Sequence, residues 1–257
     1  MTGLITPVID REFIAGFFHD RGIDLYAVVS ASSLHAPAGR RPCDLLASAE
    51  TMILFCMEMD KDLFSGTPTE ISSKVRDFVT NLRNVEDDLA SALKSGGFDA
   101  TPVLSVILSD GTIKGDLSLP HCAADAGLGE IGDNRLLISY RHGCRIGLGA
   151  VITSIGMEET PLPEPSGETC NHCKKCIRAC PEHALSPGTL DLFRCRNVTG
   201  SVPGFLLPVM VPFMQSGIRI PFSNWLLDLL AKRKVNACAD CLTSCPHFHQ
   251  DPSDQGS

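Results

Sequence analysis

Eight of the twelve cysteines in this 257-residue chain lie beyond residue 169, and their spacing suits metal binding. One run is Cys170-x2-Cys173-x2-Cys176-x3-Cys180-Pro181, another is Cys238-x2-Cys241-x3-Cys245-Pro246, and Cys195 lies between them. Three thiolates at equal short spacing, with a fourth directly before a proline, form the ligand pattern of a [4Fe-4S] cluster. Two such clusters need eight thiolates, and these segments supply eight.

The first run has the spacing found in bacterial ferredoxins, where the cysteine before the proline binds the neighbouring cluster. We therefore predict two groups of ligands, named here the first thiol set (Cys170, Cys173, Cys176 and Cys245) and the second thiol set (Cys180, Cys195, Cys238 and Cys241). Zinc is the alternative, since paired C-x2-C units also form tetrahedral zinc sites. Zinc does not account for three equally spaced thiolates followed by Cys-Pro. A disulfide framework is less favoured still, because the first residues show no secretory signal and the chain is too long to need disulfides for stability.

The composition narrows the class of protein. Hydrophobic residues make up 44% of the chain, enough for one large domain or for one medium and one small domain. The formal charge of −8 argues against a nonspecific nucleic-acid surface, which is normally basic. The first ten residues show no export signal, and no apolar run reaches the length of a membrane span. We expect a cytoplasmic protein of an organism that spends time without oxygen.

The first 156 residues carry alternating strand and helix patterns, which predict an α/β (α+β) layer domain. The predicted helices are Arg11–Asp20, capped by Asp10, and Thr69–Ser95, and the predicted strands are Leu25–Val29, Thr51–Met57, Pro102–Leu108 and Ile146–Ser154. Thr51–Met57 is nearly all apolar, so we expect it to be buried on both faces. A ferredoxin-like domain follows over residues 157–257; it begins with a proline-rich linker and contains an insertion at 196–237.

A glycine-rich segment is the second informative stretch. Gly127, Gly129 and Gly132 follow a short predicted helix and precede the apolar residues Leu136–Ile138. This order of helix, glycines and strand is the reverse of a dinucleotide-binding fingerprint. Glycines here either let the backbone approach a large flat cofactor or only form turns. Composition alone favours turns and leaves both readings open.

Residues Ala126–Ser139, followed by Gly147–Thr153 and the two cysteine runs, resemble the core shared by epoxyqueuosine reductases and corrinoid-dependent reductive dehalogenases. Arg41–Leu54 is similar to a segment that these families carry before their second strand. The resemblance covers roughly residues 10–250 and implies a nitroreductase-like domain that holds base-off cobalamin beside a module with two [4Fe-4S] clusters. It implies that the first thiol set lies nearer the cobalamin. The implied cobalamin-binding residues are Gly127, Leu128, Gly129, Gly132, Asn134, Leu136, Leu137, Ile138 and Gly149.

A reductive cleavage also needs a proton donor. The resemblance implies an acidic donor upstream of the glycines, where Asp110 and Asp116 lie outside the motif of the family. His121 and Tyr140 are the other candidates, although either residue alone is more often part of a core, and Asp116 suits a turn or cap. Cys122 and Cys144 we interpret as small buried hydrophobes.

Three functional hypotheses follow from these residues. The leading one is a cobalamin-dependent reductase with two [4Fe-4S] clusters, a ferredoxin- or flavodoxin-type electron donor and an unidentified small-molecule substrate. The second is an electron-transfer or reductive-activation protein for a partner's corrinoid. The third is a cofactor-binding protein without a substrate of its own. The chain stops at Ser257 without the helical repeats that help epoxyqueuosine reductases hold tRNA, so tRNA is a possible but less favoured substrate.

Overall fold

The computed structural model describes residues 9–36, 41–103, 107–109, 112–114, 117–161, 169–196 and 238–249. Two of the predicted proton donors, Asp110 and Asp116, lie outside these ranges. So does the predicted insertion after its first residue, Arg196, together with most of the predicted linker.

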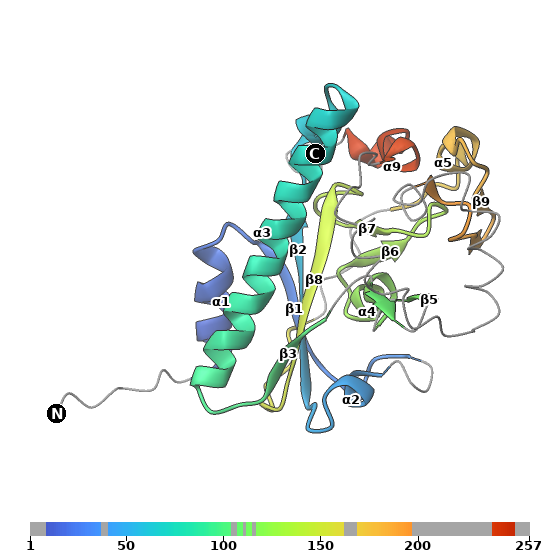
Figure 1. Cartoon of the computed structure of the whole chain (residues 1–257). Helices are drawn as coiled ribbons and strands as arrows, with labels where there is room; N and C mark the ends of the chain where they lie inside the picture. The colour runs from blue at the N-terminus through green and yellow to red at the C-terminus, as the bar shows by residue number, and fades with distance from the viewer. Residues whose placement is uncertain are drawn as a thin grey trace.

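A four-stranded sheet forms the centre of the described chain (Figure 1). Its strands are, in spatial order, β1 (Leu25–Ser30), β2 (Thr51–Glu58), β8 (Ile146–Thr153) and β3 (Ala100–Pro102). Every neighbouring pair is antiparallel, with Thr51 of β2 opposite Thr153 of β8. The strands expected near residues 25, 51 and 146 are confirmed, with small differences at their ends.

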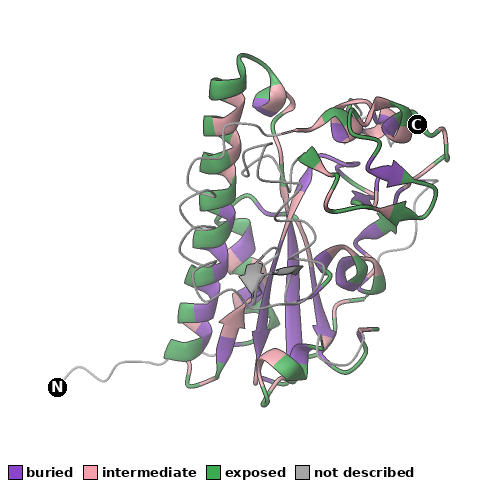
Figure 2. Cartoon of the chain, turned by 45° about the vertical axis from the view of Figure 1, so that its right-hand side comes forward, coloured by how far each residue is buried: buried purple, intermediate pink, exposed green. Residues whose placement is uncertain are grey.

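Strand β2 is buried on both faces, as its apolar sequence predicts. Its side chains alternate between two cores. Met52 and Leu54 pack on one side of the sheet, whereas Ile53 and Phe55 pack on the other. Other elements must therefore cover both faces of the sheet. Figure 2 shows the strands of the sheet as the most buried part of the molecule.

Two helices cover one face of the sheet (Figure 1). Helix α1 (Arg11–His19) starts at Asp10, whose carboxylate accepts the Phe13 N–H at 2.8 Å. Helix α3 (Pro68–Ser95) starts with a capping box between Thr67 and Glu70. Both predicted helices are thus confirmed. The second half of the apolar stripe of α3 is fully buried against the sheet, while its outer face is exposed (Figure 2).

The opposite face is covered by helix α4 (Leu119–Asp125) and a hairpin of β6 (Gly129–Ile131) and β7 (Leu137–Ser139). Gly127, with φ +73°, turns the chain from α4 into β6. The predicted order of helix, glycines and strand is confirmed. This layer lies between the central sheet and the cysteine-bearing segments (Figure 1).

The strand predicted over Pro102–Leu108 is wrong. Strand β3 ends at Pro102, and a separate hairpin pairs β4 (Ile107–Ser109) with β5 (Thr112–Lys114). Among the described residues, the last hydrogen bond on this side of β8 runs from the Val103 N–H to the Ala150 carbonyl. The Ala150 N–H donates instead to Glu86 Oε1 at 3.0 Å. A side chain of α3 thus replaces the strand carbonyl that an antiparallel pair would supply there.

The remaining elements are short. They are α2 (Pro42–Leu45), the 3-10 helix η1 (Lys61–Phe64), α5 (Lys175–Ala179), β9 (Leu185–Ser186), β10 (Thr189–Leu190), α9 (Asp240–Thr243) and the 3-10 helix η2 (Pro246–Phe248). Helices α5 and α9 pack against each other and carry part of each cysteine run. Among the described residues, no helix combines the length and the apolar character that crossing a membrane requires.

Candidate metal-cluster site

One pocket brings together all four cysteines of the first thiol set. Cys170, Cys173 and Cys176 line it from the first cysteine run, and Cys245 lines it from the second. The pocket encloses about 290 Å³, including the space that is open to solvent. Residues separated by some seventy positions therefore meet as the crossing rule of two-cluster ferredoxins predicts.

The backbone of the first run curls around this pocket by adopting strained conformations. His172 and Lys174 both have left-handed backbones, with φ +52° and +57°. Such conformations are uncommon for residues other than glycine and persist where the surrounding structure enforces them. The guanidinium of Arg178 then donates to the Cys173 carbonyl at 3.0 Å. These turns direct three thiols from a short segment toward one centre.

The thiol of Cys245 is the best prepared to become a thiolate. A hydrogen bond from Cys144, together with the His247 backbone N–H and nearby histidine charge, lowers the pKa of Cys245 to about 6 although burial opposes the shift. The contact with Cys245, together with burial, raises the pKa of Cys144. Because the thiolate is the form that binds metals, Cys245 is suited to act as a ligand.

The second thiol set also gathers in the structure. Burial raises the pKa of Cys241 to about 12, and the charges of Cys238, Cys195 and Cys180 add to the shift in that order. The charge of Cys176 acts on Cys241 as well, so the two sets are neighbours. Four crowded thiols are costly to ionise without a metal. A cation that binds them all would compensate this repulsion, because a coordinated thiol loses its proton.

The turn between β6 and β7 forms another wall of the pocket. Asn134 is 3% exposed, and its Oδ1 accepts the Leu136 N–H at 3.1 Å. Its Nδ2 is buried without a hydrogen-bond partner among the described residues. Gly132 makes room for this side chain, since a Cβ there would lie 2.9 Å from Asn134 Oδ1. An unpaired buried donor beside four thiols fits a group with acceptor sulfurs, as a [4Fe-4S] cluster has.

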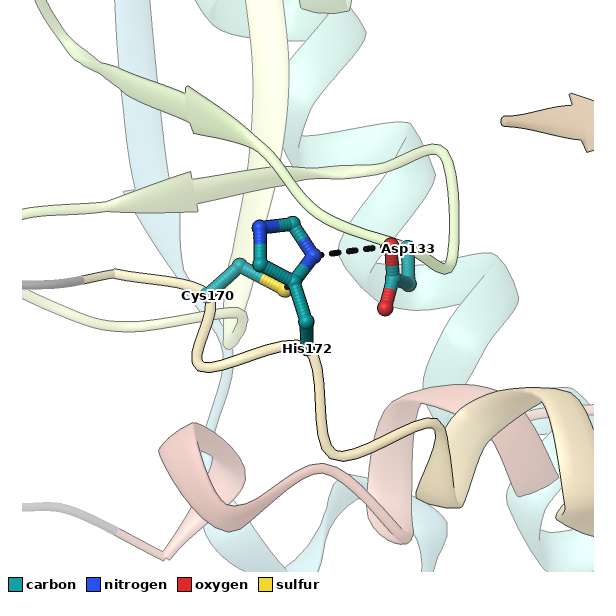
Figure 3. A group of neighbouring side chains, drawn as sticks. All are labelled: Asp133, Cys170 and His172. Atoms are coloured by element: carbon teal, nitrogen blue, oxygen red, sulfur yellow. Dashed lines mark hydrogen bonds and ion pairs between the residues drawn. The ribbon is translucent and has the colours of Figure 1, made fainter. Parts of the chain in front are cut away.

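Asp133, on the same turn, lies beside His172 (Figure 3). Its Oδ1 is 3.1 Å from His172 Nδ1, which in turn lies 3.9 Å from the sulfur of Cys170. These three residues could hold a metal ion by themselves. The wider pocket adds three more thiols, however, and soft sulfur ligands in that number favour an iron–sulfur cluster over a three-ligand site.

Two buried side chains, His142 and Arg145, pair with partly exposed carboxylates in a network that supports the turn between β7 and β8. Arg145 binds Glu58 at 3.0 Å, and the nearly buried His142 lies between Glu58 and Asp24, with its Nε2 2.8 Å from Asp24. The same turn contains Cys144 and Gly143, and a Cβ on Gly143 would collide with the His247 carbonyl. The network thus fixes the part of the sheet domain that contacts the second cysteine run.

The sequence does not reveal this network, and it predicts Cys144 only as a small buried hydrophobe. Cys144 is indeed 1% exposed, but it lies in one apolar cluster with Cys245, Leu242 and Phe248. Charged residues at two strand ends, Glu58 and Arg145, were the available signal for the network. No spacing rule links Cys144 to Cys245.

Two of the glycines assigned to a corrin, Gly129 and Gly149, pack closely against other parts of the chain. A Cβ on Gly129 would collide with the Ile138 carbonyl across the β6–β7 hairpin. A Cβ on Gly149 would collide with the ring of Phe55. Close packing within the chain therefore explains both glycines, and they do not offer bare backbone to a ligand.

Most of the apolar residues assigned to a corrin are also buried in the protein core. Leu128 and Leu137 pack beneath the sheet, and Ile138 packs with the second cysteine run. Leu136 differs, because it is 37% exposed. Leu136 is thus the apolar member of the predicted set whose side chain is exposed, and the assignment of these residues to a corrin stays a prediction.

The described proton-donor candidates lie in different surroundings. His121 is exposed on α4, with Nδ1 2.6 Å from Ser118 Oγ and Nε2 3.4 Å from the Arg135 guanidinium. Tyr140 is half-buried after β7, and burial, followed by the charge of Glu130, raises its phenol pKa. The raised pKa makes this phenol a weaker acid, so the shift moves Tyr140 away from the near-neutral pKa that suits a proton donor. Both assignments stay predictions.

Comparison with curated proteins gives partial matches to two kinds of reductase. A tetrachloroethene reductive dehalogenase from Dehalobacter restrictus (strain DSM 9455 / PER-K23) is 34% identical over 139 residues, which are 53% of this chain and 24% of that enzyme. An epoxyqueuosine reductase from Bacillus subtilis (strain 168) is 29% identical over 144 residues, 54% of this chain and 32% of the relative. The chain thus spans about a third or less of these relatives. No protein-family model matches it.

Solved structures match over nearly the whole chain. A crystal structure of epoxyqueuosine reductase aligns with a TM-score of 0.57 at 20% identity, covering 93% of this chain and 65% of that one. A catabolic reductive dehalogenase in complex with 3-bromo-4-hydroxybenzoic acid aligns with a TM-score of 0.63 at 16% identity, covering 95% and 32%. The chain has a mixed α/β fold that resembles the core of these enzymes, with a cysteine-rich C-terminal region.

Proposed function

We propose that the chain is an iron–sulfur reductase of the superfamily of epoxyqueuosine reductases and reductive dehalogenases, because its sequence matches part of both enzymes and its fold resembles their core. In this proposal residues 1–156 form a nitroreductase-like domain and residues 157–257 form a ferredoxin-like domain. The first thiol set holds one [4Fe-4S] cluster and the second thiol set holds another. These clusters supply one-electron transfer.

The observation that carries the proposal is the meeting of Cys245 with Cys170, Cys173 and Cys176 around one pocket. The charges of Cys238, Cys195, Cys180 and Cys176 all act on Cys241, which supports a second group of four thiols close to the first. Adjacent cluster sites suit electron transfer in series, from a ferredoxin- or flavodoxin-type donor toward the sheet domain.

We further propose that the electrons serve a reductive cleavage that depends on base-off cobalamin. A reductive dehalogenase of this superfamily is described as B12-dependent, and an epoxyqueuosine reductase has been solved with a tRNA stem loop. Cobalamin would supply the reductive chemistry, while His121 or Tyr140 would hold the proton delivered to the substrate. The cobalamin proposal rests on the resemblance to these enzymes. The packing around Gly129 and Gly149 gives it no support, because neighbouring groups of the chain fill the space beside both glycines.

That internal packing favours a second candidate function. If the described glycines do not face a corrin, the chain transfers electrons to the corrinoid of a partner protein. The cluster sites are the same in both proposals, and the difference lies in whether this chain itself binds cobalamin.

Anaerobic reconstitution tests both parts. The protein should take up about eight iron and eight sulfide per chain, since two cubes contain four of each. Added cobalamin should then give the absorption spectrum of a bound, base-off corrinoid, and substitution of the exposed Leu136 by Asp should weaken its binding at unchanged iron content.

Stoichiometric zinc without broad visible absorption would exclude the cluster assignment. Full iron content without cobalamin binding would instead exclude the cobalamin-dependent reductase and select the electron-transfer function. Leu192, which is 40% exposed near the second thiol set, offers the matched control: Leu192→Asp should leave cobalamin binding unchanged.

A further inference from the structure

We propose that two turns of the sheet domain each present one hydrogen-bond donor to the cluster of the first thiol set, and thereby raise its reduction potential. The donors are Asn134 Nδ2–H, from the β6–β7 turn, and Cys144 Sγ–H, from the β7–β8 turn. The inference rests on the proposed function, because it requires a [4Fe-4S] cluster in this pocket. It assigns positioning residues that act on the potential of the cluster and do not bind iron.

The orientation of the Asn134 amide follows from its one hydrogen bond. Its Oδ1 accepts the N–H of Leu136, two residues further along the chain, so the amide nitrogen is left for the pocket. The side chain is 3% exposed and lines the pocket together with the four thiols. An amide nitrogen has two donors and no acceptor, and leaving them unpaired in a buried site is costly. Cluster and ligand sulfurs are the acceptors that this pocket would offer.

The neighbouring polar residue does not suit the same role. Asp133 can only accept a hydrogen bond when ionised, and its carboxylate already lies beside His172. A carboxylate next to an anionic cluster is repelled by it. Asn134 is thus the member of this turn whose chemistry complements sulfur.

Cys144 is an independent second donor. Its thiol is 1% exposed, donates to the Leu242 carbonyl at 3.7 Å and packs in one apolar cluster with Cys245. Hydrogen bonds to a charged acceptor are stronger than those to a neutral carbonyl. A metal-bound Cys245 therefore attracts the Cys144 S–H more than Leu242 does.

Both donors act in the same direction. Reduction adds negative charge to the cluster and its sulfurs, and a donor that points at a sulfur stabilises that charge. Hydrogen bonds to the sulfurs are among the features that set the reduction potentials of iron–sulfur clusters. Removing either donor should therefore lower the potential of the first cluster and leave the second cluster unaffected.

The test is an EPR-monitored redox titration of anaerobically reconstituted full-length protein. Asn134→Ser retains a neutral acceptor for the Leu136 N–H but is too short to donate into the pocket, and Cys144→Ala removes the thiol. Each variant should reduce the equilibrium constant for reduction of the first cluster about tenfold, which is about 59 mV for a one-electron couple. Cys144→Ser, which keeps an O–H donor, should stay near the wild-type value.

Iron content separates the possible failures. Wild-type protein that binds no iron overturns the proposed function, and this inference with it. Variants with full iron and an unchanged potential of the first cluster overturn the inference alone. If the potential of the first cluster shifts in only one variant, the residue replaced in that variant is a donor and the other residue is not. If the two residues only pack, the variants would lose thermal stability without a change in potential.

Discussion

At the scale of single residues, the contact between Cys144 and Cys245 is the most informative detail. The pKa of Cys245 is lowered to about 6 mainly because the Cys144 thiol donates to it. This contact therefore favours the thiolate form of Cys245, which is the form that binds metals. Cys144 also places a second sulfur beside the ligand position, and a test of the ligand assignment has to take that sulfur into account.

The partition of the thiols can be tested by two variants. In Cys144→Ala/Cys245→Ala, the first cluster loses its fourth thiolate and the neighbouring sulfur that could replace it. We expect a three-iron form of the first cluster, with the second cluster intact. Cys195→Ala should do the reverse. Anaerobic EPR and iron analysis distinguish the two outcomes.

The control for this pair is Cys43→Ala, since Cys43 is exposed and belongs to neither thiol set. Its cluster signals should match the wild type. An unchanged spectrum of Cys195→Ala would remove Cys195 from the ligands and disprove the assignment of the second thiol set.

The sequence predicted which cysteines gather, because thiolate spacing follows directly from cluster geometry. It grouped Cys245 with Cys170 across some seventy intervening residues, and the structure places them around one pocket. It did not predict Cys144 or the orientation of Asn134. Their positions depend on how two turns of the sheet domain pack against the second cysteine run, and no local pattern encodes that packing.

At the scale of elements, helix α3 contributes a buried carboxyl group to the sheet. Glu86 is 3% exposed, and its Oε1 accepts the Ala150 N–H at 3.0 Å. Burial raises the pKa of Glu86 from 4.5 to about 7, and the hydrogen bond and Arg83 oppose the shift only in part. The folded protein thus holds the proton more tightly than the unfolded chain does.

Linkage turns this shift into a dependence of stability on pH. Because the folded pKa is raised, the stabilising contribution is complete below pH 4.5 and is lost as pH rises through 7. The loss amounts to about 3 kcal/mol for a shift of this size. Glu86→Gln keeps the acceptor but cannot ionise. It should therefore be more stable than the wild type at pH 8 and similar to it at pH 4.

Urea unfolding followed by circular dichroism at both pH values measures this difference. Glu70→Gln serves as a comparison, because Glu70 is an exposed capping residue at the start of the same helix. Parallel pH profiles for the wild type and Glu86→Gln would contradict the buried-carboxyl account.

Helix α3 and strand β2 were predictable because each carries a long periodic or continuous apolar pattern. The strand expected over Pro102–Leu108 was not, because its apolar run is divided between β3 and β4. The reason is tertiary: Glu86 takes the hydrogen bond that would have continued β3. A polar residue inside the stripe of α3 was the available signal, but its partner 64 residues away was not visible in the sequence.

At the scale of the whole molecule, Gly143 is a point of close contact between the β7–β8 turn and the second cysteine run. Its backbone has φ +59°, and a Cβ would collide with the His247 carbonyl. The Glu58, His142 and Arg145 network holds the same turn from behind. The contact therefore sets where Cys245 lies relative to the sheet.

Gly143→Ala should separate these two parts without unfolding the sheet. The collision with His247 displaces the second cysteine run, so we expect roughly half of the bound iron to be lost from the first thiol set, whose cube is one of two. Gly188→Ala is the matched control. Gly188 has φ +75° with nothing within 4 Å, so it has the left-handed strain without the collision.

Iron analysis and far-UV circular dichroism read out both variants. Gly188→Ala should cost about 1–2 kcal/mol from backbone strain while keeping its iron. Equal iron content in the two variants would show that the contact with His247 does not position Cys245.

The order of strands in the sheet has a consequence for how the protein is made. Strand β8 lies between β2 and β3, yet it pairs with β2 about one hundred residues after β2 has been synthesised. Until then β1–β2 is the only pair of the four-stranded sheet that can form, and β2 keeps an unpaired apolar edge that invites association with other chains. Such long-range pairing is slow. Since both cysteine runs follow β8, the sheet can be complete before Cys245 leaves the ribosome. Iron would then be delivered to a chain whose first half is already folded, with the β6–β7 and β7–β8 turns waiting in place.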